Sequence, residues 1–505
     1  MEKRLFFAIT LSFIFLFVWA NIVGKQQAVK SLKKSESYQN IKIEETPSKP
    51  INLPQKEKVN LPPSFFELTL KNRKIIFLEP QSCIKQITFS DYQDSIYTLQ
   101  NALLFGFGDM PFSKQLIDNK EVKYEYVDKE KRIIKDFIFN EEDYGLQLKI
   151  IIENLTGNLL NIELPLSLGT ADVTANDRMH FIGATVWDEE KLFYPNLKNS
   201  KTFHNVKFVS LRNRYFCIIL EPQKKGYSAY INKLGNNSTE ISVSIPEKIG
   251  PYEKIIQNYK IFIGPQDKRI LAKVDPNWTA VIYFGKLDFI AQGLLKILEI
   301  FYLFFKNWGW AIVALSIFIY LVLYPLTLKQ MKSMKEMQIL QPQVEKLRQQ
   351  YKNNPQRLNQ EILELYKAHK INPMGGCLPI LLQIPVFFAL YQVLSRSISL
   401  KGASFLWIKD LSESDRILML PNSLPLIGNE INILPLLMAI IMVFQQKLTT
   451  QTLSGPQAEQ QKLMTIILPI MFGVLFYHMP AGLVLYWLVN SLLTLTFQIR
   501  LAKTK

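Results

Sequence analysis

Long apolar runs dominate roughly the last 200 residues of the chain, and they constrain the fold more than any other feature. A helix of about 20 apolar residues can cross a bilayer, because all its backbone hydrogen bonds are made within the segment. The runs cover residues 310–328, 377–394, 433–444, 463–479 and 483–501. The chain is therefore predicted to be a polytopic α-helical membrane protein.

A further apolar run stands near the N-terminus, at residues 5–23, after Lys3 and Arg4. We predict an uncleaved transmembrane anchor over residues 1–24, which brings the expected number of spans to six. A cleaved signal peptide is the alternative, because Val18 and Ala20 could precede a cleavage site. Residues 25–60 are rich in Lys, Gln, Ser, Glu and Pro and are predicted to form a flexible linker.

Residues 61–283 show short runs of strand-forming residues, such as 123–127 and 146–152, separated by turn residues. This pattern predicts a large all-β domain of sandwich type. It contains no recognisable catalytic constellation. Cys83 and Cys217 fall in this domain and could form a disulfide, but two separate buried thiols are the favoured interpretation.

Residues 287–306 have a helical pattern in which a narrow polar stripe runs along an otherwise apolar surface. The stripe consists of Asp288, Gln292, Lys296 and Glu299. This pattern predicts an amphipathic helix that lies in the membrane interface. Packing of the helix against the β domain is the alternative.

The distribution of charge predicts the topology. The segment 329–371 is strongly basic, whereas the connection 395–432 has no basic excess. Basic excess marks the cytoplasmic side of a membrane, so both termini and segment 329–371 are predicted to be cytoplasmic and the β domain periplasmic. The net charge of +16 fits basic cytoplasmic segments better than nucleic-acid binding, because the apolar spans are present.

Segment 329–371 carries two apolar helical stripes with a break at Asn353 to Pro355, which predicts an antiparallel helical hairpin. Pro342 predicts a kink or break near Gln341. The basic surface suits an acidic partner such as ribosomal RNA or lipid headgroups, and a merely solvated surface is an equal alternative. The candidate partner-binding residues are Lys346, Arg348, Lys352 and Arg357.

The later spans contain no charged residue at mid-depth, which argues against an ion-coupled transporter. Uncharged polar residues and prolines are present instead. Each polar residue could bond a neighbouring helix, and together they could line a wet groove. No cofactor or metal is expected, because the chain has no CxxC pair and no phosphate-binding loop.

Several motifs in the last part of the chain occur in an order and spacing that resemble one known family. They are Tyr324-Pro325-Leu326-Thr327, Leu340-Gln341-Pro342, Asn372-Pro373-Met374-Gly375-Gly376-Cys377-Leu378-Pro379, Gln383-Ile384-Pro385, Leu390-Tyr391, Phe405-Leu406-Trp407-Ile408-Lys409-Asp410-Leu411 and Pro480-Ala481-Gly482-Leu483-Val484-Leu485-Tyr486-Trp487. The chain resembles the YidC/Oxa1/Alb3 membrane protein insertases, in the YidC form of bacteria with two membranes.

The resemblance implies a five-span insertase core over residues 309–501 with a hydrophilic groove, in the cell inner membrane, and no enzymatic activity. The expected partners are nascent membrane proteins, components of the Sec translocon, the lipid bilayer and, through the hairpin, the ribosome. By motif position, the groove residues are Ser316, Tyr320, Gln383, Tyr486 and Trp487.

The chain departs from the family pattern at Tyr320, where an arginine usually stands four residues before the tyrosine of Tyr-Pro-Leu-Thr. The usual attraction for acidic substrate segments is therefore expected to be weaker here. Two other functions are considered. A small-solute transporter or channel would show inverted repeats or intramembrane charges. The other function is a carbohydrate-binding or sugar-modifying β domain on a membrane anchor. Removal of residues 61–283 would separate it from an insertase, because an insertase core should still work without them.

Overall fold

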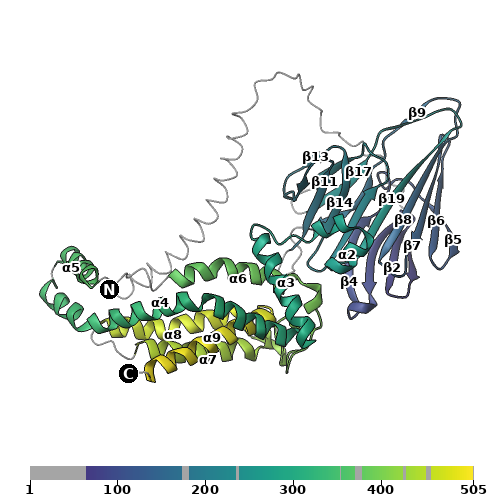
Figure 1. Cartoon of the computed structure of the whole chain (residues 1–505). Helices are drawn as coiled ribbons and strands as arrows, with labels where there is room; N and C mark the ends of the chain where they lie inside the picture. The colour runs from purple at the N-terminus through teal and green to yellow at the C-terminus, as the bar shows by residue number, and fades with distance from the viewer. Residues whose placement is uncertain are drawn as a thin grey trace, which may run out of the picture. The chain divides into compact units, whose positions relative to one another are not determined.

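The computed structural model describes residues 64–172, 181–234, 238–352, 354–369, 378–424, 428–450 and 456–503 (Figure 1). The predicted anchor (1–24), the linker (25–60) and the start of the third span at Cys377 lie outside these residues. Residues 57–453 and 465–505 form one compact unit, and the contacts described below lie within it.

The β domain contains two large antiparallel sheets. The first is an eight-stranded sheet, in the spatial order β1 (Ser64–Thr69), β2 (Arg73–Glu79), β3 (Cys83–Phe89), β4 (Ser95–Ala102), β10 (Leu166–Asp172), β17 (Ser238–Ser244), β16 (Ser228–Leu234) and β13 (Lys201–Phe203). The second is a nine-stranded sheet, in the order β12 (Leu192–Phe193), β11 (Gly183–Asp188), β14 (Val206–Arg212), β15 (Phe216–Pro222), β19 (Lys254–Pro265), β8 (Gly145–Asn154), β7 (Lys131–Phe139), β6 (Glu121–Val127) and β5 (Ser113–Asp118). A small pair is formed by β9 (Leu160–Ile162) and β18 (Glu247–Ile249).

Alternation of side chains explains why these segments form strands with one buried face. In β8, the side chains of Leu146, Leu148, Ile150 and Ile152 are buried, while Gln147 between them is exposed. Buried residues from both sheets form one continuous apolar core. The rings of Phe77 from the first sheet and Phe137 from the second meet edge to face, 5.5 Å apart. The predicted sandwich is confirmed.

Cys83 and Cys217 are both buried, free thiols in this core, as the favoured interpretation expected. Burial raises the pKa of the Cys83 thiol to about 11. These cysteines therefore behave as small apolar core residues rather than as reactive groups.

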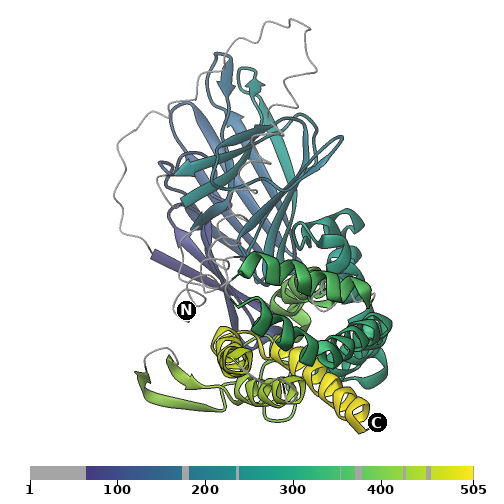
Figure 2. The same cartoon turned by 90° about the vertical axis from the view of Figure 1, so that its left-hand side faces the viewer.

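The helices follow the β domain along the chain. They are α2 (Lys268–Val274), α3 (Asp288–Phe305), α4 (Trp308–Gln350), α5 (Pro355–Ala368), α6 (Leu378–Arg396), α7 (Ile433–Thr450), α8 (Pro456–Phe476) and α9 (Ala481–Lys503). A short hairpin, β20 (Leu418–Leu424) and β21 (Gly428–Ile431), precedes α7. Figure 2 shows α9 in yellow among the other helices of this group, and α9 packs against both α4 and α7.

Among the described residues, two helical segments are long and apolar enough to cross a membrane: Trp308–Lys329 in α4 and Ala481–Arg500 in α9. Two shorter apolar segments, Ile433–Leu448 and Ile466–Phe476, lie in α7 and α8. Buried residues of several of these helices form a second apolar core. It includes Leu315 of α4, Leu390 of α6 and Met438 of α7. The structure thus supports apolar helices in the predicted membrane region, and the number of six spans stays a prediction.

The first arm of the predicted hairpin is a direct continuation of α4. The helix does not break at Pro342, and a kink there stays a prediction. α4 runs without interruption from Trp308 to Gln350, with Pro325 and Pro342 inside it. Pro342 is exposed, whereas Leu340 and Val344 on either side are buried. The packing of these apolar neighbours keeps the helix intact despite the hydrogen bond that proline cannot donate.

The helix α3 has different contacts on its two sides. On its polar stripe, Asp288 accepts a hydrogen bond from the backbone N–H of Phe284, and Gln292 donates to the carbonyl of Ile282. On the apolar side, Phe289 is 92% exposed and Phe304 is 78% exposed. The polar stripe therefore contacts the segment that joins α3 to the β domain. The apolar surface is divided: Ala291 and Leu298 are buried in the second apolar core where α3 packs against α4 and α6, and Phe289 and Phe304 lie outside it.

Candidate functional site

Polar side chains follow one face of α9 at intervals of one helical turn. Tyr486 is fully buried, and Asn490 and Thr494 follow it at four-residue steps. Asn490 donates through its amide to the carbonyl of Tyr486, and Thr494 donates to the carbonyl of Asn490. The α9 helix thus carries a polar stripe within an otherwise apolar span.

The α4 helix carries a matching polar stripe. Ser316 is buried, and its hydroxyl donates to the carbonyl of Ile312 at 2.7 Å. Tyr320 is half-buried, and its hydroxyl is enclosed without a hydrogen-bond partner among the described residues. The Tyr324 ring packs on Tyr320 and on Phe497 of α9. Since α4 packs against α9, the two polar stripes belong to neighbouring helices.

One hydrogen bond joins α6 to α9 between two residues predicted for the groove. The amide of Gln383 donates to the hydroxyl of Tyr486 across 2.7 Å. Gln383 is half-buried, so the bond lies at the edge of the helix core rather than in open solvent. The two residues are 103 positions apart, so no local pattern in the sequence indicated that they form a pair, although each was a candidate by its motif.

The Gln383–Tyr486 bond should contribute measurably to stability. We expect Tyr486→Phe and Gln383→Leu each to lower the free energy of unfolding by about 1–2 kcal/mol. The double variant should lose about as much as the worse single variant, because both substitutions remove the same bond. Thermal unfolding of the purified protein in detergent would measure this. Strict additivity would mean that the two residues do not interact.

Trp487 lies on a different side of α9 from its neighbour Tyr486. Its ring packs among Phe387 of α6 and Phe472 and Phe476 of α8, at centroid distances of 5.3–5.8 Å. Adjacent residues of a helix point about 100° apart, which accounts for the difference. The structure therefore brings Gln383 and Tyr486 together and directs Trp487 into an aromatic cluster.

The polar stripes carry hydroxyl and amide groups, and the segments Trp308–Lys329 and Ala481–Arg500 contain no His, Asp, Glu or Cys side chain. In Trp308–Lys329 and Ala481–Arg500, the only charged residues are Lys329 and Arg500, each at the end of its segment. Within the described parts of the chain, no cluster of three or more His, Cys, Asp or Glu side chains could hold a metal ion. What this arrangement offers is hydroxyl and amide groups that can hydrogen-bond water or a polar chain inside an apolar surrounding.

The basic residues predicted for partner binding lie on the outside of the α4–α5 hairpin. Lys346, Lys352 and Arg357 are exposed, and Arg348 is half-buried. Arg357 lies 3.8 Å from the carboxylate of Glu361 and 5.3 Å from the Tyr351 ring. The inner faces of the hairpin are apolar, so the positive charge is available on its surface.

The sequence did not indicate Arg214, which stands between β14 and β15. Its guanidinium bonds to Ser395, Ser412 and Glu413, which lie close to 200 residues further along the chain. A single arginine in a turn of a β domain gives no local signal of such a contact. Only the tertiary structure identifies it.

Comparison with known proteins identifies the family. A family model described as 60Kd inner membrane protein matches residues 300–505, and one described as YidC periplasmic domain matches residues 69–297. The crystal structure of an active YidC insertase with its first transmembrane domain resolved aligns over 86% of this chain and 92% of that chain, at 20% identity and a TM-score of 0.41.

Three relatives carry the name membrane protein insertase YidC. The Cupriavidus necator protein is 34% identical over 381 residues, which are 73% of this chain and 65% of that protein. The Geobacter sulfurreducens protein is 34% identical over 375 residues, with 72% and 67% covered, and the Syntrophobacter fumaroxidans protein is 33% identical over 391 residues, with 73% and 68% covered. The chain thus spans just under two thirds of the Cupriavidus protein and slightly more of the other two. Together with the two family models, these matches show that the chain belongs to the YidC family of membrane protein insertases, inner membrane proteins with a periplasmic domain.

Proposed function

We propose that this protein inserts nascent proteins into the inner membrane through a hydrophilic groove bounded by α4, α6 and α9, alone or together with the Sec translocon. The names of its relatives support this activity. The observation that carries the groove is the enclosed hydroxyl of Tyr320, which has no partner among the described residues. A buried polar group without a partner costs free energy unless water or a bound chain completes its hydrogen bonding.

The physical role of the groove is to shorten the apolar path of a polar segment. A charged residue at the centre of a bilayer costs about 2.5–3.5 kcal/mol on insertion scales. Hydroxyl and amide groups at Tyr320, Gln383, Tyr486 and Asn490 would keep water beside such a segment while the apolar segment enters the lipid. Burial of about 20 apolar residues then drives insertion without a nucleotide.

The proposed topology has six spans, the N-terminal anchor and the five later ones, with both termini and the α4–α5 hairpin in the cytoplasm. The basic surface of this hairpin would contact the ribosome or anionic lipid headgroups. The helix α3 would lie in the interface at the periplasmic surface of the membrane, since Phe289 and Phe304 are exposed. Trp308 and Trp310 at the start of α4 suit the same boundary.

Photo-crosslinking tests the groove directly. Probes at Tyr320, Gln383 and Asn490, which are half-buried and lie in the proposed groove, should crosslink a ribosome-held nascent membrane protein at defined chain lengths, and the crosslinks should fade when the chain is released. A probe at Phe318, which is exposed on the opposite side of α4, serves as the matched control and should crosslink lipid. Crosslinks to lipid or to neighbouring helices alone, at all three positions, would contradict the proposal.

The residue at position 320 should tune the preference for acidic substrates. We expect Tyr320→Arg to raise the insertion of substrates with acidic translocated tails by a few-fold, because a cation at partial depth attracts them in a medium of low dielectric constant. Tyr320→Gln is the matched control, since it adds polarity without charge. Insertion assays with acidic and neutral tails would measure the ratio. An equal ratio in both variants would rule out a role for charge here.

A further inference from the structure

The turn between β14 and β15 places one arginine of the β domain against the helical core. Arg214 is 9% exposed. Its Nε atom donates to the carbonyl of Ser395 at 2.6 Å, Nη2 donates to the carbonyl of Ser412 at 2.6 Å, and Nη1 donates to the Glu413 carboxylate at 2.8 Å. The planar fork of a guanidinium can satisfy three acceptors at once, which an ammonium group cannot do with the same geometry.

The first acceptor belongs to the end of α6. Ser395 is in the last turn of this helix, where backbone carbonyls lack partners within the helix. A cation at a helix C-terminus also interacts favourably with the helix dipole. Arg214 therefore caps α6 from the β domain.

The other two acceptors lie in a connection that caps two more helices. The backbone N–H of Ala481 donates to the carbonyl of Glu413 at 2.6 Å, and that of Gly482 donates to the carbonyl of Leu411 at 2.8 Å. These two N–H groups start α9. The connection therefore satisfies the N-terminus of the helix that carries Tyr486 and Asn490.

The same connection caps α7 through Asp415. This carboxylate accepts hydrogen bonds from the backbone N–H groups of Ile433 and Leu434, both at 2.9 Å. Tyr215, next to Arg214, donates its hydroxyl to the Ser412 hydroxyl at 3.0 Å. Arg214 thus bonds the C-terminal end of α6 directly, and residues 411–415 link Arg214 and Tyr215 to the N-terminal ends of α7 and α9.

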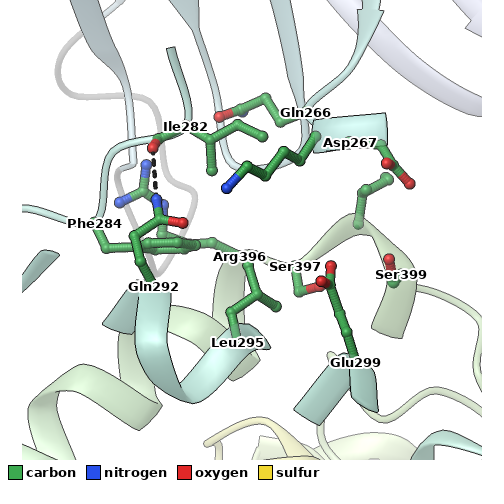
Figure 3. Close-up of a pocket in the computed structure, with 12 residues that line it drawn as sticks. Gln266, Asp267, Ile282, Phe284, Gln292, Leu295, Glu299, Arg396, Ser397 and Ser399 are labelled. Carbon is green, nitrogen blue, oxygen red and sulfur yellow. Dashed lines mark hydrogen bonds between the residues drawn. The ribbon is translucent and has the colours of Figure 1, made fainter. Parts of the chain in front are cut away.

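The contact continues around a small cavity between the end of the β domain, α3 and the segment after α6 (Figure 3). Its volume is about 30 Å³. Figure 3 shows Gln266 and Asp267 on one side of it and Gln292, Glu299 and Ser397 on the other. Arg396, which also lines the cavity, stacks on the rings of Phe181 and Phe284 at 5.0 and 5.4 Å. This part of the interface therefore combines polar side chains around the cavity with contacts between Arg396 and two aromatic rings.

We propose that Arg214 is a positioning residue that fixes the C-terminal end of α6 and the N-terminal ends of α7 and α9 to the β domain. The β domain then braces α9, which carries a polar stripe, and α6, which carries Gln383, rather than only being attached to them by the chain. This inference rests on the contacts of Arg214. It depends on the proposed function only where insertion is measured.

Hydrogen exchange of the full-length protein in lipid nanodiscs tests the brace. In Arg214→Met, the amides of Ile433, Leu434, Ala481 and Gly482 should exchange about tenfold faster or more, because the connection that accepts their hydrogen bonds loses its anchor. Arg214→Lys should give an intermediate increase, since it keeps the charge but not the fork. Glu413→Gln should give about a twofold to threefold increase, because the two carbonyl acceptors remain.

The control is Arg269→Met, which removes an arginine of the same domain whose side chain is 71% exposed and pairs with Asp267. Its exchange should match the unmodified protein. Unchanged exchange at the four amides in Arg214→Met would overturn the proposal. Equally faster exchange in β8 and β19 would overturn it too, because the effect would then be a general loss of stability.

Insertion measured in the same variants separates this inference from the proposed function. Arg214→Met should lower insertion several-fold, and Arg214→Lys should restore part of it. If the unmodified protein gives no insertion, the proposed function fails while the exchange result still decides the brace. If the amides exchange faster but insertion is unchanged, the coupling of the brace to the groove is refuted.

Discussion

Between pH 7 and 8.5, the free energy of unfolding of the β domain should rise by about 2 kcal/mol, and Lys135→Met should abolish this rise. Lys135 lies on β7 and is fully buried in the sandwich core. Its ammonium group donates to the carbonyl of Ser82 at 2.6 Å, to the Ser82 hydroxyl at 3.0 Å and to the carbonyl of Leu103 at 2.8 Å. These acceptors are all neutral.

The sign follows from the direction of the pKa shift. Burial lowers the pKa of Lys135 to about 7, from 10.5 for an ordinary lysine. Between these values the unfolded chain binds a proton that the folded chain does not, so the folded state gains stability as the pH rises. Below pH 7 both states are protonated, and the burial of the charge then costs the most. Each pKa unit corresponds to about 1.4 kcal/mol.

This slope would be measured by urea unfolding of the full-length protein at pH 7.0, 7.5, 8.0 and 8.5. Hydrogen exchange in β8 and β19 would monitor the unfolding of the β domain. The range stops at pH 8.5 because burial raises the pKa of Cys83 and gives an opposite slope at higher pH. Lys225→Met is the matched control, since Lys225 is exposed, and it should keep the slope. A slope of the same size in Lys135→Met would show that another group titrates.

Replacement of Trp278 should produce a large loss of stability in the β domain. We expect Trp278→Ala to lower the free energy of unfolding by about 3–5 kcal/mol. Trp278 is fully buried in the 3-10 segment Pro276–Val281. Its indole N–H donates to the Glu221 carboxylate at 2.8 Å, and the Lys260 ammonium lies 4.9 Å from the ring centroid. The residue fastens the end of the domain to β15 and β19.

Two further variants separate the contributions of Trp278. Trp278→Phe keeps most of the apolar contact and loses the bond to Glu221, so it should cost about 1–3 kcal/mol. Tyr252→Ala removes an exposed ring and should change stability by less than about 0.5 kcal/mol. Urea unfolding of the three variants would be compared. A loss below about 1 kcal/mol in Trp278→Ala would mean that this segment does not hold the domain together.

The sequence determined the class of each region through its local periodicity. The segment 146–152 has apolar residues at every second position, with Gln147 and Lys149 between the first three, and forms the centre of β8, because one face of that strand is buried. The segment 287–306 has a helical stripe and forms α3, within one residue at each end. Motifs in the later spans also identified Gln383 and Tyr486 as candidates. In each of these cases the information lies within one helix or strand.

Only the tertiary structure decided how these elements meet. β4 pairs with β3, its neighbour in sequence, on one side and with the distant strand β10 on the other. In α9, Trp487 packs into an aromatic cluster while Tyr486 bonds Gln383. Pro342 stays inside α4 because its apolar neighbours are packed. Arg214 reaches a connection about 200 residues away. These outcomes depend on contacts between distant segments, whose free energy is set by geometry in three dimensions and leaves no periodic trace in the sequence.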